Sequence, residues 1–278
     1  MIASLRAESL KTRKRWANWI LFAILLAWIV LLSYLTFYLV VRLSPHSIQG
    51  PIPASVLKRR LFPENYVPTV LNAAESIGAA IMLIFGALST ASEYGWLTVQ
   101  TILIQKPARL AVLGGKVLGN GISTVVVSLA LLGVTALSSY VVVTIDSSSS
   151  SWPSWEVTLK AFGALVLELA VWTSLGAFLG IAFRSAAAAI GGGLVYLFVV
   201  EALFGSLFRT TPVVKEILKF LPGVNSGAIN ASFPATFRDT TATALVGAGR
   251  GVITLLLYLA VITVASLLIF QRRDVGGS

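Results

Sequence analysis

Six long apolar stretches, separated by shorter polar segments, dominate the hydrophobic pattern of the chain. Each is close to the roughly 20 helical residues that cross the hydrocarbon core of a bilayer. The stretches are continuous rather than alternating, and backbone groups in lipid must be hydrogen-bonded within their own segment, so helices are favoured over a barrel. The pattern predicts an all-α membrane protein with six transmembrane helices, at residues 19–41, 70–91, 115–143, 159–183, 187–208 and 251–270.

The composition agrees with this pattern, since 56% of the 278 residues are hydrophobic and only 12% are charged. A soluble domain carries about 25% charged residues. The net charge is +10, but the basic residues lie at the ends of apolar stretches, where they suit anionic lipid headgroups. We therefore expect one transmembrane domain over residues 1–278, with membrane lipid and not nucleic acid as a partner.

The residue types needed for several kinds of chemistry are missing from the sequence. There is no cysteine, and the one histidine, His46, stands beside a proline in a predicted loop. No metal-ligand cluster or nucleophile motif occurs. Gly114-Gly115-Lys116 lacks both the first glycine and the hydroxyl residue of a Walker A motif. We expect a chain that is not an enzyme, has no catalytic residue, and holds no metal or cofactor of its own.

Residues 1–18 precede the first apolar stretch and carry five basic residues, with Leu5, Leu10 and Trp16 between them. This mixture predicts an amphipathic helix that lies on the lipid surface. A disordered basic leader is the alternative. The first stretch is long enough to stay in the membrane, and no cleavable signal peptide is evident.

An even number of spans places both chain ends on one side of the membrane. The Lys and Arg totals do not decide which side, because they are 11 on the side of the termini and 10 on the other. Basic residues in short segments near the first span carry more weight. We therefore predict cytosolic termini in the inner (plasma) membrane, although the cluster 58–60 counts against this orientation. The serine-rich segment 146–154 would then lie outside.

A polar block at residues 93–116 separates the second and third stretches. Residues 93–105 have apolar positions at helical spacing, and Pro107 ends the pattern because proline lacks a donor and restricts the residue before it. The residues alone allow two interpretations. One is a short helix that lies against the membrane and meets a partner, and the other is an ordinary basic loop next to the membrane.

This block resembles the type-2 ABC exporter permease family, in which a Glu-aromatic segment precedes Pro-x-Arg and Gly-Lys before the third span. Leu97 stands where that family usually has glycine, and the six-span plan extends the resemblance over most of the chain. The matching positions are Glu93, Tyr94, Thr98, Leu103, Pro107, Arg109, Gly115 and Lys116.

The resemblance implies a specific assembly. Residues 93–105 would be a coupling helix that docks on a separate ABC ATPase subunit, and that subunit would bind ATP and Mg. Two ATPase copies would serve two permease chains, which the resemblance implies form a homodimer. Residues 1–18 would be an interfacial helix, and 209–250 would form short or re-entrant helices at the outer surface. The expected ATPase contacts are Glu93, Tyr94, Trp96, Thr98 and Arg109.

Three acidic residues lie within apolar stretches, where a charge is costly and therefore suggests function. Glu75, Glu168 and Glu201 could face one outward-opening polar cavity and mark the cargo path. Alternatively, each could pair with a nearby base or hydroxyl within the bundle, or lie close enough to the interface to be hydrated. Gly176 and Gly180 form a Gly-x-x-x-Gly pair, a pattern that lets helices approach closely. Packing within one bundle is the favoured interpretation of this pair, and a dimer seam is the alternative.

These observations together predict the membrane-spanning permease subunit of an ATP-driven exporter with an unidentified cargo. The alternative is an ATP-independent secondary transporter or channel. Such a protein should show an internal repeat and broken spans near the bilayer midplane.

Overall fold

Six helical segments dominate the computed structural model, which describes residues 2–43, 58–95, 109–204, 207, 212–235 and 244–272. All six are long and apolar enough to cross a membrane, as a multi-pass membrane protein requires. This confirms the predicted all-α fold with six helices of the length and composition of transmembrane spans, whereas the interfacial helix and the coupling helix stay predictions. The segments are Trp16–Leu43, Pro63–Glu93, Leu110–Asp146, Trp155–Phe183, Ala186–Leu203 and Ala248–Arg272.

The helices differ from the predicted spans mainly at their ends. The second segment begins at Pro63, seven residues before the predicted start, because Pro63–Asn65 forms a 3-10 turn that leads directly into the helix. The fifth segment is described only to Phe204, so the predicted end at residue 208 is not reached within its described helix. Apolar periodicity marks where a helix enters lipid, whereas the helix itself continues into the polar region.

The elements follow one another with few breaks. The first half contains α1 (Ile2–Lys14), α2 (Trp16–Ala27), η1 (Trp28–Thr36), α3 (Phe37–Leu43), η2 (Pro63–Asn65), α5 (Tyr66–Ala73), η3 (Ala74–Gly78) and α6 (Ala79–Gly95). The second half contains α8 (Arg109–Asp146), α9 (Trp155–Phe183), α10 (Ala186–Val195), η4 (Tyr196–Phe204), α12 (Pro212–Leu218), α13 (Pro222–Asn230) and α14 (Ala248–Arg272).

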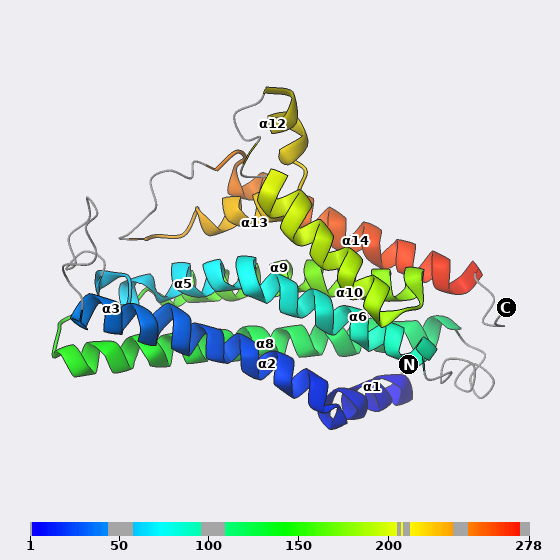
Figure 1. Ribbon diagram of the computed structural model, residues 1–278, viewed down its shortest axis with the longest axis horizontal. Helices are drawn as coiled ribbons and strands as arrows, with labels where there is room; N and C mark the ends of the chain where they lie inside the picture. The colour runs from blue at the N-terminus through cyan, green and yellow to red at the C-terminus, as the bar shows by residue number, and fades with distance from the viewer. Residues whose placement is uncertain are drawn as a thin grey trace.

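The N-terminal helix is shorter than the predicted 1–18 segment. α1 ends at Lys14, and Arg15 is extended, with φ −83° and ψ 110°, before α2 begins at Trp16. The chain therefore turns at Arg15, and α1 leaves the direction of the first span, as Figure 1 shows. That α1 lies on a lipid surface stays a prediction.

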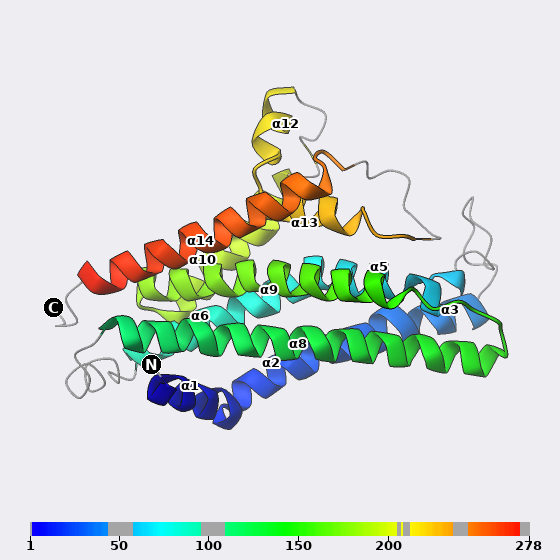
Figure 2. The same cartoon turned by 180° about the vertical axis from the view of Figure 1, so that it is seen from behind.

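The long helices run side by side along the long axis of the molecule, and α10–η4 and α14 cross them obliquely (Figures 1 and 2). The start of α1 and the end of α14 lie near one end of this bundle, together with the end of α6 and the start of α8. The end of α3 and the connection from α8 to α9 lie at the opposite end. The short helices α12 and α13 lie between η4 and α14, within the predicted 209–250 segment.

The contact between α6 and α9 is the most extensive in the bundle, and glycine makes it possible. A Cβ atom on Gly86 would lie 2.0 Å from the Thr173 carbonyl oxygen, and one on Gly176 would lie 2.0 Å from the Leu83 carbonyl oxygen. Gly180 faces Thr90, whose hydroxyl donates to the Ala177 carbonyl at 3.0 Å. Gly176 and Gly180 thus pack within the bundle, as the favoured interpretation held.

Replacing Gly176 with Ala should lower the stability of the folded chain, because the new methyl group would overlap the backbone of α6. Overpacking of this kind costs about 1–3 kcal/mol. Gly163→Ala on the same helix is the matched control, since nothing lies within 4 Å of its Cβ position. Thermal unfolding in detergent should show a lower midpoint for G176A and an unchanged or higher one for G163A. Equal midpoints would contradict this account of the contact.

Candidate functional site

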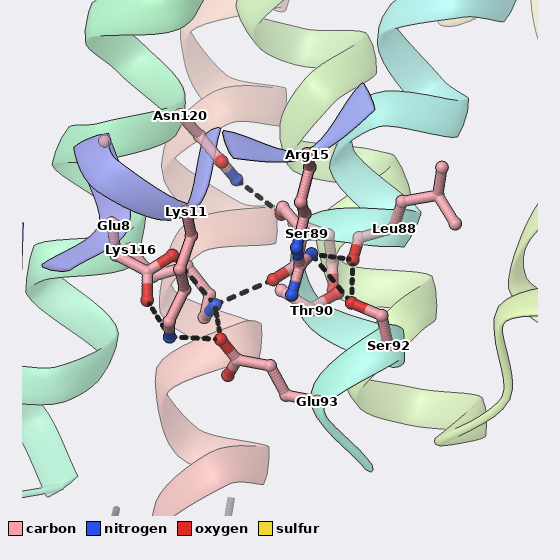
Figure 3. A network of polar contacts seen from close by, with 12 residues as sticks. Glu8, Lys11, Arg15, Leu88, Ser89, Thr90, Ser92, Glu93, Lys116 and Asn120 are labelled. Atoms are coloured by element: carbon pink, nitrogen blue, oxygen red, sulfur yellow. Dashed lines mark hydrogen bonds and ion pairs between the residues drawn. The ribbon is translucent and has the colours of Figure 1, made fainter. Parts of the chain in front are cut away.

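An ion-pair network joins the N-terminal helix to the ends of two spanning helices (Figure 3). We call it the Glu93 network, and it consists of Glu8 and Lys11 of α1, Glu93 of α6 and Lys116 of α8. Lys11 Nζ lies 2.7 Å from Glu93 Oε1 and 2.9 Å from Glu8 Oε1. Lys116 Nζ lies 2.9 Å from Glu93 Oε1 and 3.2 Å from Glu8 Oε2. Each carboxylate therefore meets both ammonium groups.

The centre of the Glu93 network is withdrawn from water. Glu93 and Lys116 are each 5% exposed, and removing ions from water costs several kcal/mol unless pairing and further hydrogen bonds offset it. Lys116 donates such a bond to the Ser89 carbonyl at 2.7 Å. Burial lowers the pKa of Lys11, but hydrogen bonds and charge interactions with Glu93 and Glu8 outweigh burial and raise this pKa above its ordinary value. Lys11 is therefore charged at neutral pH.

A second set of contacts fixes the turn between α1 and α2 against α6. The guanidinium of Arg15 donates to the Leu88 carbonyl at 3.2 Å and to the Ser92 hydroxyl at 2.8 Å. Asn120 of α8 donates to the Ser89 hydroxyl at 3.0 Å. The last turns of α6 are thus held from both sides, by the N-terminal helix and by α8 (Figure 3).

Two glycines one turn apart on α8 allow α1 to approach closely. A Cβ atom on Gly115 would lie 2.6 Å from Ser4 Cβ, and one on Gly119 would lie 3.1 Å from Glu8 Cβ. Small residues permit such contacts between helices. Gly115 was noted in the sequence only for its match to a family pattern, and its packing role depends on a residue more than a hundred positions away.

The expected ATPase contacts have different placements. Glu93 and Tyr94 belong to the last turn of α6, so the helix of the second span continues through them instead of a new helix starting there. The Glu93 carboxylate is engaged within the chain. Arg109 is the first residue of α8. Trp96, Thr98 and the rest of 96–105 lie outside the described residues, and contact with an ATPase stays a prediction for all five residues.

The three acids within the spans come together around α13, and we call them the acid cluster. Glu201 accepts hydrogen bonds from the Tyr196 hydroxyl at 3.0 Å and from the Gly223 amide at 2.9 Å. Glu75 accepts a bond from Asn230 Nδ2 at 2.9 Å. Gly223 and Asn230 lie at opposite ends of α13, so these two carboxylates hold the short helix at both ends.

Glycine also lets α13 approach these carboxylates. A Cβ atom on Gly223 would lie 2.5 Å from Glu201 Oε2, and one on Gly227 would lie 3.0 Å from Glu75 Oε1. The amide of Gly223 belongs to the first turn of α13, where unpaired N–H groups and the helix dipole favour a negative charge. Leu221, which precedes this helix, supplies no side-chain cap, so Glu201 takes that role from another span.

Glu168 of α9 completes the acid cluster and is only 2% exposed. Its electrostatic neighbours are the Glu75 carboxylate and the side chains of Asn230 and Ser226. Glu168 and Glu201 form no ion pair with any residue in the described ranges. The structure thus brings the three predicted residues together, but a role in a cargo path remains to be proposed.

Two members of the acid cluster lie on π-helical segments. Glu75 lies on η3 and Glu201 on η4, and a third π segment, η1, occurs in the first span. Single π turns within α-helices occur frequently at functional sites. Sequence periodicity did not predict these segments, because a π turn shifts the pattern by one residue without interrupting the apolar run.

The partners of both sites were not anticipated from the sequence. Glu8 and Lys11 were considered only as part of a helix on the lipid surface, and Asn230 only as part of the 209–250 segment. Tyr196 and Ser226 were not singled out. Polar residues within the otherwise apolar 196–230 region were the available signal, but only the fold pairs each of them with an acid on another span.

A family model described as "Protein of unknown function (DUF2705)" matches residues 65–276. The chain belongs to this family. The match covers the second to the sixth spanning segment and includes every member of the acid cluster as well as Glu93 and Lys116. A comparison with curated proteins gives no match.

Replacing Glu93 with Gln should loosen the N-terminal helix, because two ammonium groups would then share one carboxylate in a buried place. Breaking a buried ion pair costs about 3–5 kcal/mol. We expect a lower thermal midpoint in detergent and faster tryptic cleavage after Arg13 and Lys14.

The matched control is Glu156→Gln on α9. Its carboxylate is 66% exposed and pairs with Lys160 at 2.6 Å, and exposed pairs of this kind contribute little to stability. If E93Q unfolds and is cleaved like E156Q, the Glu93 network does not hold α1.

Proposed function

We propose that the protein is the membrane-spanning permease subunit of an ATP-driven ABC exporter, with ATP hydrolysis carried out by a separate ATPase subunit. The observation that supports this most is the Glu93 network. It links the N-terminal helix to the end of α6 and the start of α8, the two helices that residues 96–108 connect along the chain. A force applied to that segment would act on both neighbouring spans and on α1.

The proposed assembly has two permease chains, as a homodimer, and two ATPase copies. ATP binding would close the ATPase pair and move the 93–105 segment, and the spans would then exchange between two arrangements. Such an exchange needs states that differ in their affinity for the ATPase arrangement and the cargo. Glu93 has a positioning role in this scheme, because it fixes the start of the segment through Lys11 and Lys116. The proposed ATPase contacts remain Glu93, Tyr94, Trp96, Thr98 and Arg109.

A second candidate function, an ATP-independent secondary transporter, is favoured by one specific observation. The π segments η3 and η4 interrupt regular α-helix where Glu75 and Glu201 lie, and irregular spans with polar groups are typical of transporter binding sites. Transport that continues without any ATPase partner would favour this candidate.

Docking can be tested by co-purification with a candidate ATPase that carries a Walker A motif. Trp96→Ala should reduce recovery of the ATPase roughly 30-fold, since an aromatic anchor in an interface is worth about 2 kcal/mol. Thr98→Arg should have a similar effect. Ser149→Arg, in the serine-rich connection at the opposite end of the bundle, is the control and should leave recovery unchanged. Equal recovery of all variants, or no ATPase association of the unaltered chain, would overturn the proposal.

The orientation in the membrane can be tested by thiol labelling. The sequence contains no cysteine, so only an introduced cysteine can react. We place both termini in the cytosol and residues 146–154 outside the inner membrane. A membrane-impermeant thiol reagent added to intact cells should label Ser149→Cys and should not label Lys14→Cys. Permeabilised cells should show both labelled. The reverse pattern in intact cells would place the termini outside and would contradict the proposed orientation.

A further inference from the structure

Glu168 differs from the other two members of the acid cluster in having no hydrogen bond for one of its oxygens. Glu201 and Glu75 accept bonds at the two ends of α13. Glu168 Oε1 has no partner among the described residues, although the side chain is 2% exposed. An unpaired buried polar atom is costly, and a buried carboxylate more so. A hydrogen-bond donor to Glu168 Oε1 would therefore stabilise this carboxylate.

The neighbouring side chains cannot supply all that is missing. Ser226, 1% exposed, faces Glu168, and its Oγ has no partner among the described residues. Asn230 is the other polar neighbour of Glu168, and its Oδ1 has no partner there either, while its Nδ2 donates to Glu75. Glu168, Ser226 and Asn230 are thus neighbours, and each has one oxygen without a hydrogen-bond partner in the described ranges. Of these three oxygens only that of serine carries a hydrogen, and the second N–H of Asn230 Nδ2 is the other donor nearby.

From this arrangement we propose that Glu168 Oε1, Ser226 Oγ and Asn230 Oδ1 form a binding site for a primary ammonium group. A primary ammonium carries three N–H donors and one positive charge. The three donors match the three acceptors, and the charge offsets the Glu168 carboxylate. Glu75 lies beside this site and strengthens the negative potential there.

The ligand class follows from two further features. No three acidic, histidine or cysteine side chains in the described ranges are placed to share a metal ion, so we assign the site to an N–H donor and not to a metal. On α9, Leu165, Leu169 and Trp172 flank Glu168 and are at most 1% exposed. In an amine with an alkyl chain, the ammonium group would bind the polar site at Glu168 and the chain would contact the surrounding apolar side chains. Glu75 and Asn230 are only half-buried and give the site an edge that a ligand can reach.

That the bound amine is cargo rests on the proposed transport function, whereas the binding itself does not. The test therefore uses the full chain alone, in nanodiscs of phosphatidylcholine, without an ATPase. Butylammonium is the probe, and butyltrimethylammonium is its matched control, with the same tail and charge but no N–H donor. Calorimetry and thermal unfolding at pH 7 would report binding, and a failure of ATPase docking would leave these results untouched.

We expect saturable binding of butylammonium and at least about tenfold weaker binding of butyltrimethylammonium, the loss that one missing charged hydrogen bond causes. Glu168→Gln and Ser226→Ala should each weaken butylammonium binding about tenfold or more. Glu156→Gln, on the exposed part of the same helix, should bind like the unaltered chain. If E168Q does not fold, the binding of butylammonium to S226A is the deciding measurement. S226A removes one hydroxyl and changes no charge, so it should disturb folding less.

Three results would overturn the proposal. Equal affinity for the two cations would indicate general attraction to negative charge. Unchanged binding in both E168Q and S226A would place the amine elsewhere. Absence of saturable binding, together with a change of stability between pH 5 and 8 that E168Q abolishes, would mean that Glu168 binds a proton only.

Discussion

The close approach of α6 and α9 is the contact on which both sites depend. Gly86, Gly176 and Gly180 remove the side chains that would keep these helices apart, so two backbones meet without flexible groups between them. One end of this segment carries Glu93, and the η3 turn that leads into α6 carries Glu75. Eighteen residues separate these two acids, or about 27 Å at the rise of an α-helix. Glu168 lies on the partner helix.

The two sites handle buried charge in opposite ways. In the Glu93 network each of two carboxylates lies within 3.2 Å of both ammonium groups, so the charges balance inside the chain. In the acid cluster no described basic group pairs with Glu168 or Glu201. The paired charges of the Glu93 network hold α1, α6 and α8 in place. The carboxylates of the acid cluster that lack a basic partner can attract a cation from outside the chain. The first site therefore suits attachment, and the second suits binding.

The sequence was sufficient to predict the six spanning helices, because hydrophobicity and length follow directly from what a bilayer requires. It also singled out Glu75, Glu168 and Glu201, since acids within apolar stretches are rare enough to be noticed. It could not predict their partners. Asn230 is 155 positions from Glu75, and no local rule connects them. The end of α1 at Lys14 was not predicted for the same reason. The turn at Arg15 that follows it is held by hydrogen bonds to Leu88 and Ser92, which are more than 70 positions away.

The π segments have a mechanical consequence for the acids that they carry. A π turn holds more residues than an α turn, and successive residues of an α-helix are about 100° apart around its axis. Conversion of η3 to regular α-helix would therefore turn Glu75 away from Asn230 by an angle of that order, while Glu93 stayed in place at the far end of the same segment. The carboxylate would then swing out of reach of α13 without any hinge in the backbone. A change between π- and α-helix at η3 can therefore rotate one part of this long helix relative to the other about the helix axis, while the helix stays straight.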